Sequence, residues 1–149
     1  MGAVDIGVRQ IGAVRAELAP LVAAADREGH AFMRRLQDEW DGGANRFDRA
    51  GEALFGAFAG ERLVGVGGLN RDPYANADGV GRLRHLYVMP DMRRSGVGRM
   101  LVERIVAEAK AGFSLLRLRT LSADAAAFYR RLGFVEIDED TATHMMRIG

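Results

Sequence analysis

The pattern of apolar and polar residues at the start of the chain predicts one strand followed by two helices. The two kinds of residue alternate over residues 4–10, as in a strand with one buried face. Apolar residues then recur at helical spacing over residues 14–28 and 30–40. Pro20 lies inside the first helical run, and we expect the regular helix to begin or kink there because proline lacks a backbone N–H group.

The middle of the chain is expected to form three strands. Residues 52–59 and 62–69 are two strand-like runs, and the dipeptide Gly60-Glu61 between them predicts a tight hairpin. Residues 70–81 contain many turn-forming residues and predict a loop, whose length is unusual for a hairpin connection and favours a position beside a functional site. The third strand is expected over residues 83–89.

The C-terminal half contains the clearest helical pattern of the chain. Apolar residues recur there in steps of four over residues 99–111. Ser122 is a suitable cap for a further helix, and Gly133 is a suitable stop. A strand is predicted over residues 115–120, and the helix capped by Ser122 over residues 123–132. The last predicted element is a hairpin formed by residues 135–137 and 144–148.

The predicted order of elements, β-α-α-β-β-β-α-β-α-β-β, indicates an α/β (α+β) fold built on one mixed, mostly antiparallel sheet with helices on both faces. The 149 residues are enough to bury a core, and we expect residues 1–149 to form a single domain. Hydrophobic residues make up 48% of the chain and charged residues 28%, which is ordinary for a soluble globular protein.

Charge and hydropathy argue against several classes of partner. The net charge is only +1, which gives no overall field for nucleic acid or a membrane surface. No apolar run approaches the roughly 20 residues of a membrane span, and residues 1–5 lack the basic and apolar segments of a signal peptide. We therefore expect a cytoplasmic protein, a monomer or a homodimer, that binds neither nucleic acid nor a membrane.

The cysteine and histidine content limits the possible chemistry. The chain contains no cysteine, which excludes disulfide bonds, cysteine-ligated metals and a covalent acyl-cysteine intermediate. Its three histidines, His30, His85 and His144, are widely spaced and form no metal-ligand motif. We therefore expect no metal.

A basic, glycine-rich segment over residues 93–98, with sequence RRSGVG, separates the predicted strand 83–89 from the helix that follows. Glycine lets a ligand approach the backbone closely. The first N–H groups of a helix have no internal partners, and the helix dipole adds positive charge at that end. Side-chain charges come from Arg93, Arg94 and Arg99. The pattern therefore predicts a phosphate site at the backbone N–H groups of residues 94–99.

The spacing of this segment is that of neither common nucleotide loop. A Walker-type loop requires a lysine that is absent here, and a dinucleotide fingerprint requires a third glycine. The pattern Arg-x-x-Gly-x-Gly after a strand instead resembles the pyrophosphate loop of the GCN5-related N-acetyltransferases, the GNAT family. Residues 128–134, with sequence FYRRLGF, resemble a later motif of the same family. The two motifs occur in the family's order and cover roughly the C-terminal half, whereas the N-terminal half matches only in the order of its elements.

The resemblance implies an enzyme that transfers the acetyl group of acetyl-CoA directly to a primary amine, on a fold whose fourth and fifth strands splay apart to admit the acyl-coenzyme arm. Backbone N–H groups around Leu86, Val88 and Met89 would hold the arm and polarise the carbonyl. Tyr129 would be catalytic and protonate the leaving thiolate, or else be a core tyrosine, since its helical spacing also fits packing. The family often has asparagine where this chain has Ser122, which is equally well explained as a helix cap. The residues expected at the coenzyme are Leu86, Tyr87, Val88, Arg93, Arg94, Ser95, Gly96, Val97, Gly98, Arg99, Ser122 and Phe128.

The acceptor side departs from the family pattern. Many relatives have a glutamate as general base where this chain has Arg82, which cannot act as a base. His85 titrates in the right range, but strand alternation should turn it away from Arg82 and Arg84. The two arginines either bind an anionic group of the acceptor or are sheet-edge charges. The other candidate bases are water, Glu61, Asp72 and Tyr74. The residues expected near the acceptor are Arg82, Arg84, His85 and Trp40, although core packing is the favoured role of Trp40.

Two other functions fit parts of the sequence. A non-catalytic acyl-CoA sensor on the same fold is an alternative, because Arg82 and Ser122 replace the glutamate and asparagine of the family. Turnover with a panel of amines separates the two functions, since a sensor binds the thioester without consuming it. Nucleic-acid binding by the basic clusters is disfavoured, because no basic stripe follows a single element.

Overall fold

The computed structural model describes residues 5–12 and 16–149, and its elements follow the predicted order. The strands are β1 (Ile6–Gln10), β2 (Ala53–Ala59), β3 (Arg62–Arg71), β4 (Val80–Val88), β5 (Leu115–Leu118), β6 (Val135–Glu136) and β7 (His144–Arg147). The helices are α1 (Ala19–Arg27), α2 (Phe32–Gly42), α3 (Val97–Ala109) and α4 (Ala123–Arg131), with short 3-10 helices η1 (Ala16–Leu18) and η2 (Pro90–Met92). Residue 4 of the predicted first strand and residues 14 and 15 of the predicted first helix lie outside the described residues.

Local signals fix the starts of two helices as predicted. Pro20 occupies the first turn of α1, where its missing N–H group is not needed. Ser122 precedes α4, and its hydroxyl oxygen accepts a hydrogen bond of 3.2 Å from the N–H group of Ala125. The predicted loop over residues 70–81 is shorter in the structure, because β3 continues through Asn70 and Arg71 and β4 begins at Val80.

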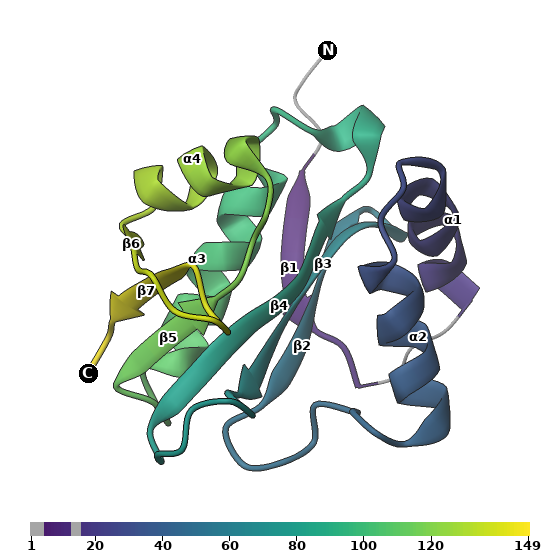
Figure 1. Ribbon diagram of the computed structural model, residues 1–149. Coiled ribbons are helices and arrows are strands. Elements are labelled where there is room, and N and C mark those ends of the chain that lie inside the picture. The colour runs from purple at the N-terminus through teal and green to yellow at the C-terminus, as the bar shows by residue number, and fades with distance from the viewer. Residues whose placement is uncertain (1–4, 13–15) are drawn as a thin grey trace.

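The strands of the described residues form one seven-stranded sheet in the order β1-β2-β3-β4-β5-β7-β6. Only β4 and β5 pair in parallel, and the other neighbours are antiparallel. Helices α1 and α2 cover one face and α3 and α4 lie on the other (Figure 1), and each face has its own buried apolar cluster. The predicted mixed sheet with helices on both faces is confirmed. In the described part of the chain, no helix combines the length and the apolar composition needed to cross a membrane.

The parallel strands β4 and β5 separate after a short shared ladder. Their paired residues run only from Val80 and Leu115 to Arg82 and Arg117. Beyond that point β4 stays paired with β3 as far as Val88, whereas β5 stays paired with β7. The two central strands therefore diverge, as the family resemblance implied (Figure 1).

A β-bulge in β4 changes the direction of its side chains. Arg84 pairs with Gly68 and Tyr87 with Val66, so two residues of β4 oppose a single residue of β3. His85 lies in this bulge with a φ of 58°, in the left-handed region that costs a non-glycine residue about 1–2 kcal/mol. The expectation that His85 faces away from Arg84 is therefore wrong, because simple alternation ends at the bulge: both side chains contact α2.

Candidate functional site

The loop between β4 and α3 presents a row of backbone donors. We call residues 93–98 the glycine loop. Within the described residues, the N–H groups of residues 94–99 have no hydrogen-bond acceptor. Gly96 caps α3 with a φ of 85°, and a Cβ there would meet no atom within 4 Å, so its conformation rather than crowding favours glycine. The start of α3 therefore has the unsatisfied donors and the dipole that an anionic group requires.

Gly98 lies where three elements approach closely. A Cβ at this position would lie 3.3 Å from Cζ of Phe128 on α4 and 3.7 Å from Cγ2 of Val88 at the end of β4. The first turn of α3 therefore lies against the diverging end of β4, with the Phe128 ring beside it. The predicted coenzyme residues Val88, Gly98 and Phe128 are brought together, although they come from three separate elements.

The three arginines of the predicted phosphate site differ in their partners. Arg93 forms an ion pair with Glu28 in which both N–O distances are 2.7 Å. The Nε atom of Arg99 lies 2.6 Å from Oε1 of Glu103, one turn further along α3. Arg94 makes no ion pair with any residue that the structure describes, and its φ is 64°. All three arginines therefore carry charge near the loop, but the charges of Arg93 and Arg99 are already balanced by carboxylates.

The edge of β4 offers fewer donors than we predicted. The N–H group of Met89 donates to the carbonyl oxygen of Val64 at 2.8 Å, so it is not available to a ligand. Because bonding directions alternate along an antiparallel pair, the N–H group of Val88 points away from β3, towards the side from which β5 diverges. The side chain of Tyr87 lies on the face of the sheet that α1 and α2 cover, where its hydroxyl group donates a hydrogen bond to Glu28. We predicted Met89 and Tyr87 at the coenzyme, but the N–H group of Met89 and the side chain of Tyr87 already have hydrogen-bond partners within the protein.

Tyr129 is buried in α4, but its hydroxyl group has no partner among the described residues. The side chain is 6% exposed and packs against the rings of Phe128, Phe134 and His144, with centroids 5.2, 5.5 and 6.4 Å away. No described residue forms a hydrogen bond with its hydroxyl group. Burial raises the pKa of Tyr129, so the phenol keeps its proton at neutral pH. Both predicted features, core packing and an available proton, are therefore present in one residue.

The bulge of β4 places a neutral histidine against α2. The Nδ1 atom of His85 lies 3.1 Å from the carbonyl oxygen of Phe32, so Nδ1 carries the donated hydrogen. Burial, and then the charge of Arg84, lower the pKa of His85 to about 3, which keeps the ring neutral. Its Nε2 atom therefore has a lone pair. Within the described part of the chain that atom is buried without a hydrogen-bond partner, as is Oε2 of Glu39, which faces the neighbouring Arg84. Glu39 was not predicted, because its contact with Arg84 of β4 joins segments 45 residues apart in the sequence.

The pKa of His85 predicts a loss of stability in acid. In the unfolded chain the group has its ordinary pKa of 6.5, so on acidification the unfolded state binds a proton before the folded state does. Between pH 7.5 and 5 this group should lower the free energy of unfolding by about 2 kcal/mol. We expect His85→Gln to remove this part of the pH dependence, measured by urea unfolding. His30→Gln, at an exposed position, is the control; an unchanged pH slope in His85→Gln contradicts the assignment.

Trp40 has the packing role that the sequence favoured. Its ring is half-buried and stacks on Phe47 with the centroids 6.5 Å apart. Phe47 in turn packs edge-on against His85 at 6.2 Å. The tryptophan therefore supports the position of the histidine through an intermediate aromatic ring.

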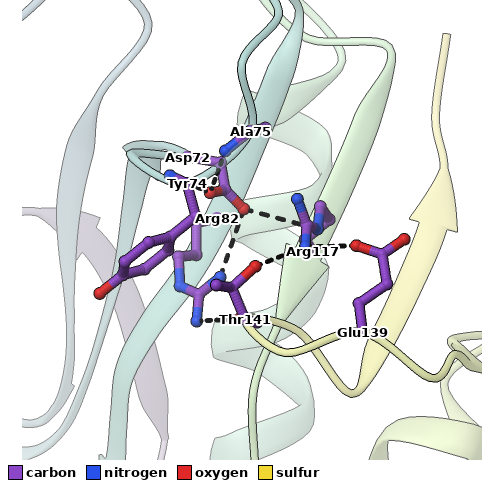
Figure 2. Close-up of polar contacts among 7 residues, drawn as sticks. All are labelled: Asp72, Tyr74, Ala75, Arg82, Arg117, Glu139 and Thr141. Carbon is purple, nitrogen blue, oxygen red and sulfur yellow. Dashed lines mark hydrogen bonds and ion pairs between the residues drawn. The ribbon is translucent and has the colours of Figure 1, made fainter.

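Arg82 belongs to a buried polar network (Figure 2). Its Nη1 atom lies 3.3 Å from Oδ2 of Asp72, and its Nη2 atom donates to the carbonyl oxygen of Thr141 at 2.7 Å. Oδ2 of Asp72 also lies 3.7 Å from Nε of Arg117, which donates through Nη2 to Glu139 at 2.7 Å. Arg82 is therefore engaged inside the protein, and an acceptor-binding role for it is not supported. Asp72 is likewise a poor candidate base, because its side chain is fully buried between two arginines.

No group of three or more possible metal ligands occurs within residues 5–12 and 16–149.

Comparison with known proteins agrees with this geometry. A family model described as "Acetyltransferase (GNAT) domain" matches residues 50–136. A proposed acetyltransferase from Exiguobacterium sp. 255-15, known from a crystal structure, superposes with a TM-score of 0.86 and 28% identity, covering 96% of this chain and 93% of the other. A GNAT-family acetyltransferase from Staphylococcus aureus Mu50 superposes with a TM-score of 0.77 and 18% identity, covering 97% of this chain and 100% of the other.

A relative known by sequence supports the same assignment. An "IAA acetyltransferase" from Azospirillum brasilense is 38% identical over 77 residues, which are 50% of this chain. The match spans 48% of the relative, so the chain corresponds to about half of that protein's length. The family model covers more than half of the chain and includes both predicted motifs. The diverging strands, the glycine loop and these matches together show that the chain belongs to the GNAT acetyltransferase family.

Proposed function

We propose that residues 1–149 form a single domain that transfers the acetyl group of acetyl-CoA to a primary amine. The observation that carries the proposal is the divergence of β4 from β5 beside six backbone N–H groups without acceptors. A long, thin ligand with an anionic centre fits these two features together. Acetyl-CoA is such a ligand, because its pantetheine arm is extended and its pyrophosphate is anionic.

The residues present fit the coenzyme at three places. The N–H groups of residues 94–99 and the Arg94 side chain would bind the pyrophosphate. The N–H group of Val88 would donate to the pantetheine arm along the open edge of β4. Gly98 keeps this approach open, because a larger side chain would enter the space next to Phe128 and Val88.

The reaction requires a proton donor for sulfur and a proton acceptor for nitrogen. The amine nitrogen attacks the thioester carbonyl, the new C–N bond forms and the C–S bond breaks. Tyr129, which stays protonated at neutral pH, would donate its proton to the departing sulfur. The extra proton on nitrogen would pass to water, because His85, whose pKa is lowered to about 3, is too weak a base to take it. No acyl-enzyme is proposed, since the chain contains no cysteine.

The acceptor would bind between β4 and α2, beside the bulge. Two buried atoms there, Nε2 of His85 and Oε2 of Glu39, are hydrogen-bond acceptors without donors. Unpaired buried acceptors are costly, and the N–H groups of an amine would satisfy them. Arg84, whose Nη2 atom is 3.9 Å from Oε1 of Glu39, is only loosely paired and would bind an anionic group of the same acceptor.

The Tyr129→Phe variant tests the catalytic part of the proposal. It removes the proton donor and keeps the ring packing, so we expect kcat to fall roughly 10- to 100-fold, about 1.4 to 2.7 kcal/mol of barrier. Stability should change little, because the hydroxyl group has no protein partner among the described residues. The measurements are thiol release from acetyl-CoA with a panel of amines, and the melting temperature.

The matched control is Tyr74→Phe, because Tyr74 is 59% exposed and lies in the loop between β3 and β4. It should leave kcat unchanged. A Tyr129→Phe variant with normal kcat and reduced stability would show that Tyr129 is a core residue. A wild-type protein that binds acetyl-CoA but consumes none with any amine would indicate a sensor instead.

A further inference from the structure

An ion pair joins the end of α1 to the glycine loop. Glu28 directly follows α1, and its two carboxylate oxygens accept hydrogen bonds of 2.7 Å from Nη1 and Nη2 of Arg93. The Nε atom of Arg93 donates to the carbonyl oxygen of Val88 at 3.1 Å. A single guanidinium group therefore connects three segments: the end of α1, the end of β4 and the glycine loop.

Tyr87 adds a second contact from β4. Its hydroxyl group donates to Oε1 of Glu28, and its ring centroid lies 5.3 Å from the guanidinium carbon of Arg93. The hydrogen bond from Arg93, and then that from Tyr87, lower the pKa of Glu28 to about 2. The carboxylate is therefore charged over the whole neutral range, and the ion pair is permanent under those conditions.

We propose that Glu28 is a positioning residue for coenzyme binding: it holds Arg93, and through Arg93 the glycine loop, in the conformation that receives the pyrophosphate. Arg93 uses three of its five N–H donors on Glu28 and Val88, and its charge is already balanced. It therefore acts as a brace of the loop rather than as the main phosphate ligand. This inference rests on the proposed function.

The backbone of the loop explains why a brace is useful. Arg94 has a φ of 64°, which is unfavourable for a residue other than glycine, and Gly96 has a φ of 85°. Such a conformation persists only where surrounding contacts maintain it. A loop that is already ordered loses less conformational entropy when a ligand binds, so its affinity is higher.

The test is coenzyme A binding by Glu28→Gln, measured by titration calorimetry. The amide has no charge and only one acceptor oxygen, so it cannot replace the two carboxylate oxygens that pair with Nη1 and Nη2 of Arg93. The brace is therefore weakened, and we expect the Kd to rise about 5- to 10-fold. In kinetics, the KM for acetyl-CoA should rise by the same factor, while the KM for the amine and kcat stay within about twofold. A role in general stability would not produce this difference between the two substrates.

Asp91→Asn is the matched control. Asp91 also forms a two-bond ion pair, with Arg62 at 2.9 and 3.0 Å, and it lies only two residues from Arg93, while its side chain makes no hydrogen bond with the glycine loop among the described residues. This variant should leave the Kd for coenzyme A unchanged. Equal weakening in Asp91→Asn and Glu28→Gln would overturn the inference, because it would indicate a general effect of lost negative charge.

A double-mutant cycle separates the brace from a direct phosphate ligand. If Glu28 and Arg93 act as one unit, Glu28→Gln, Arg93→Gln and the double variant should weaken coenzyme A binding to a similar extent. A Glu28→Gln protein that binds coenzyme A as tightly as wild type, or more tightly, overturns the inference, as do additive effects in the cycle. Failure of the wild-type protein to bind coenzyme A would instead refute the proposed function itself.

Discussion

The Gly98→Asp variant is expected to lose coenzyme A binding while remaining folded. The new carboxylate would lie in the first turn of α3, at the N–H groups proposed to receive the pyrophosphate. Like charges placed together in a binding site cost several kcal/mol, which corresponds to more than about a 100-fold loss of affinity. Folding should survive, because an acidic residue is favourable at the start of a helix. The nearest atom to the new Cβ is the ring tip of Phe128 at 3.3 Å, which requires only a small shift.

The binding loss is measured as the rise in melting temperature with added acetyl-CoA, since only the folded state binds the ligand. The control is Gly98→Ala, which adds the same Cβ without the charge and should keep most of the rise. If Gly98→Asp shows the same ligand-induced rise as wild type, the glycine loop is not the coenzyme site. If alanine is as damaging as aspartate, steric contact with Phe128 rather than charge is responsible.

The Asp72→Asn variant should have the largest effect on stability. The Asp72 side chain is fully buried, and its Oδ1 atom accepts the N–H groups of Tyr74 and Ala75 at 2.8 and 3.1 Å. Its Oδ2 atom faces Arg82 and Arg117, so an amide would leave two buried cations without this carboxylate (Figure 2). Removing one partner of a buried ion pair typically costs about 3–5 kcal/mol. We expect a decrease of that size in the free energy of unfolding, measured with urea.

The exposed ion pair between Arg62 and Asp91 provides the comparison for this variant. Both side chains are at least half exposed, and such surface pairs contribute about 0–1 kcal/mol. Asp91→Asn should therefore leave the free energy of unfolding almost unchanged. A loss below 1 kcal/mol in Asp72→Asn would mean that the network is hydrated and behaves as a surface pair.

The sequence alone determined the order of the elements and the class of the fold. Helices such as α3 have a periodic pattern of apolar residues, because one face packs against the sheet. The two motifs at residues 93–98 and 128–134 also identified the family correctly, since they depend on short spacings within one turn or one helix. The cap at Ser122 and the helix start at Pro20 were predictable for the same local reason.

The tertiary structure alone decided which charged groups have partners. Glu28 and Arg93 are 65 residues apart in the chain, and no spacing rule connects them. The sequence offered two roles for Arg82, binding an acceptor anion or being a sheet-edge charge, whereas the structure pairs it with the buried carboxylate of Asp72. An arginine that binds a ligand and an arginine that pairs with a buried carboxylate cannot be told apart in the sequence, because the partner is set by how distant segments pack.

The bulge in β4 is the other feature that only the structure supplied. Alternation predicts the side-chain directions of a regular strand, but a single extra residue reverses them for the rest of the strand. The pairing with β3 sets the position of that extra residue at His85, and the sequence of β4 gives no local signal for it. The proposed acceptor site beside Glu39 therefore follows from the register between two strands, which is a property of the folded sheet.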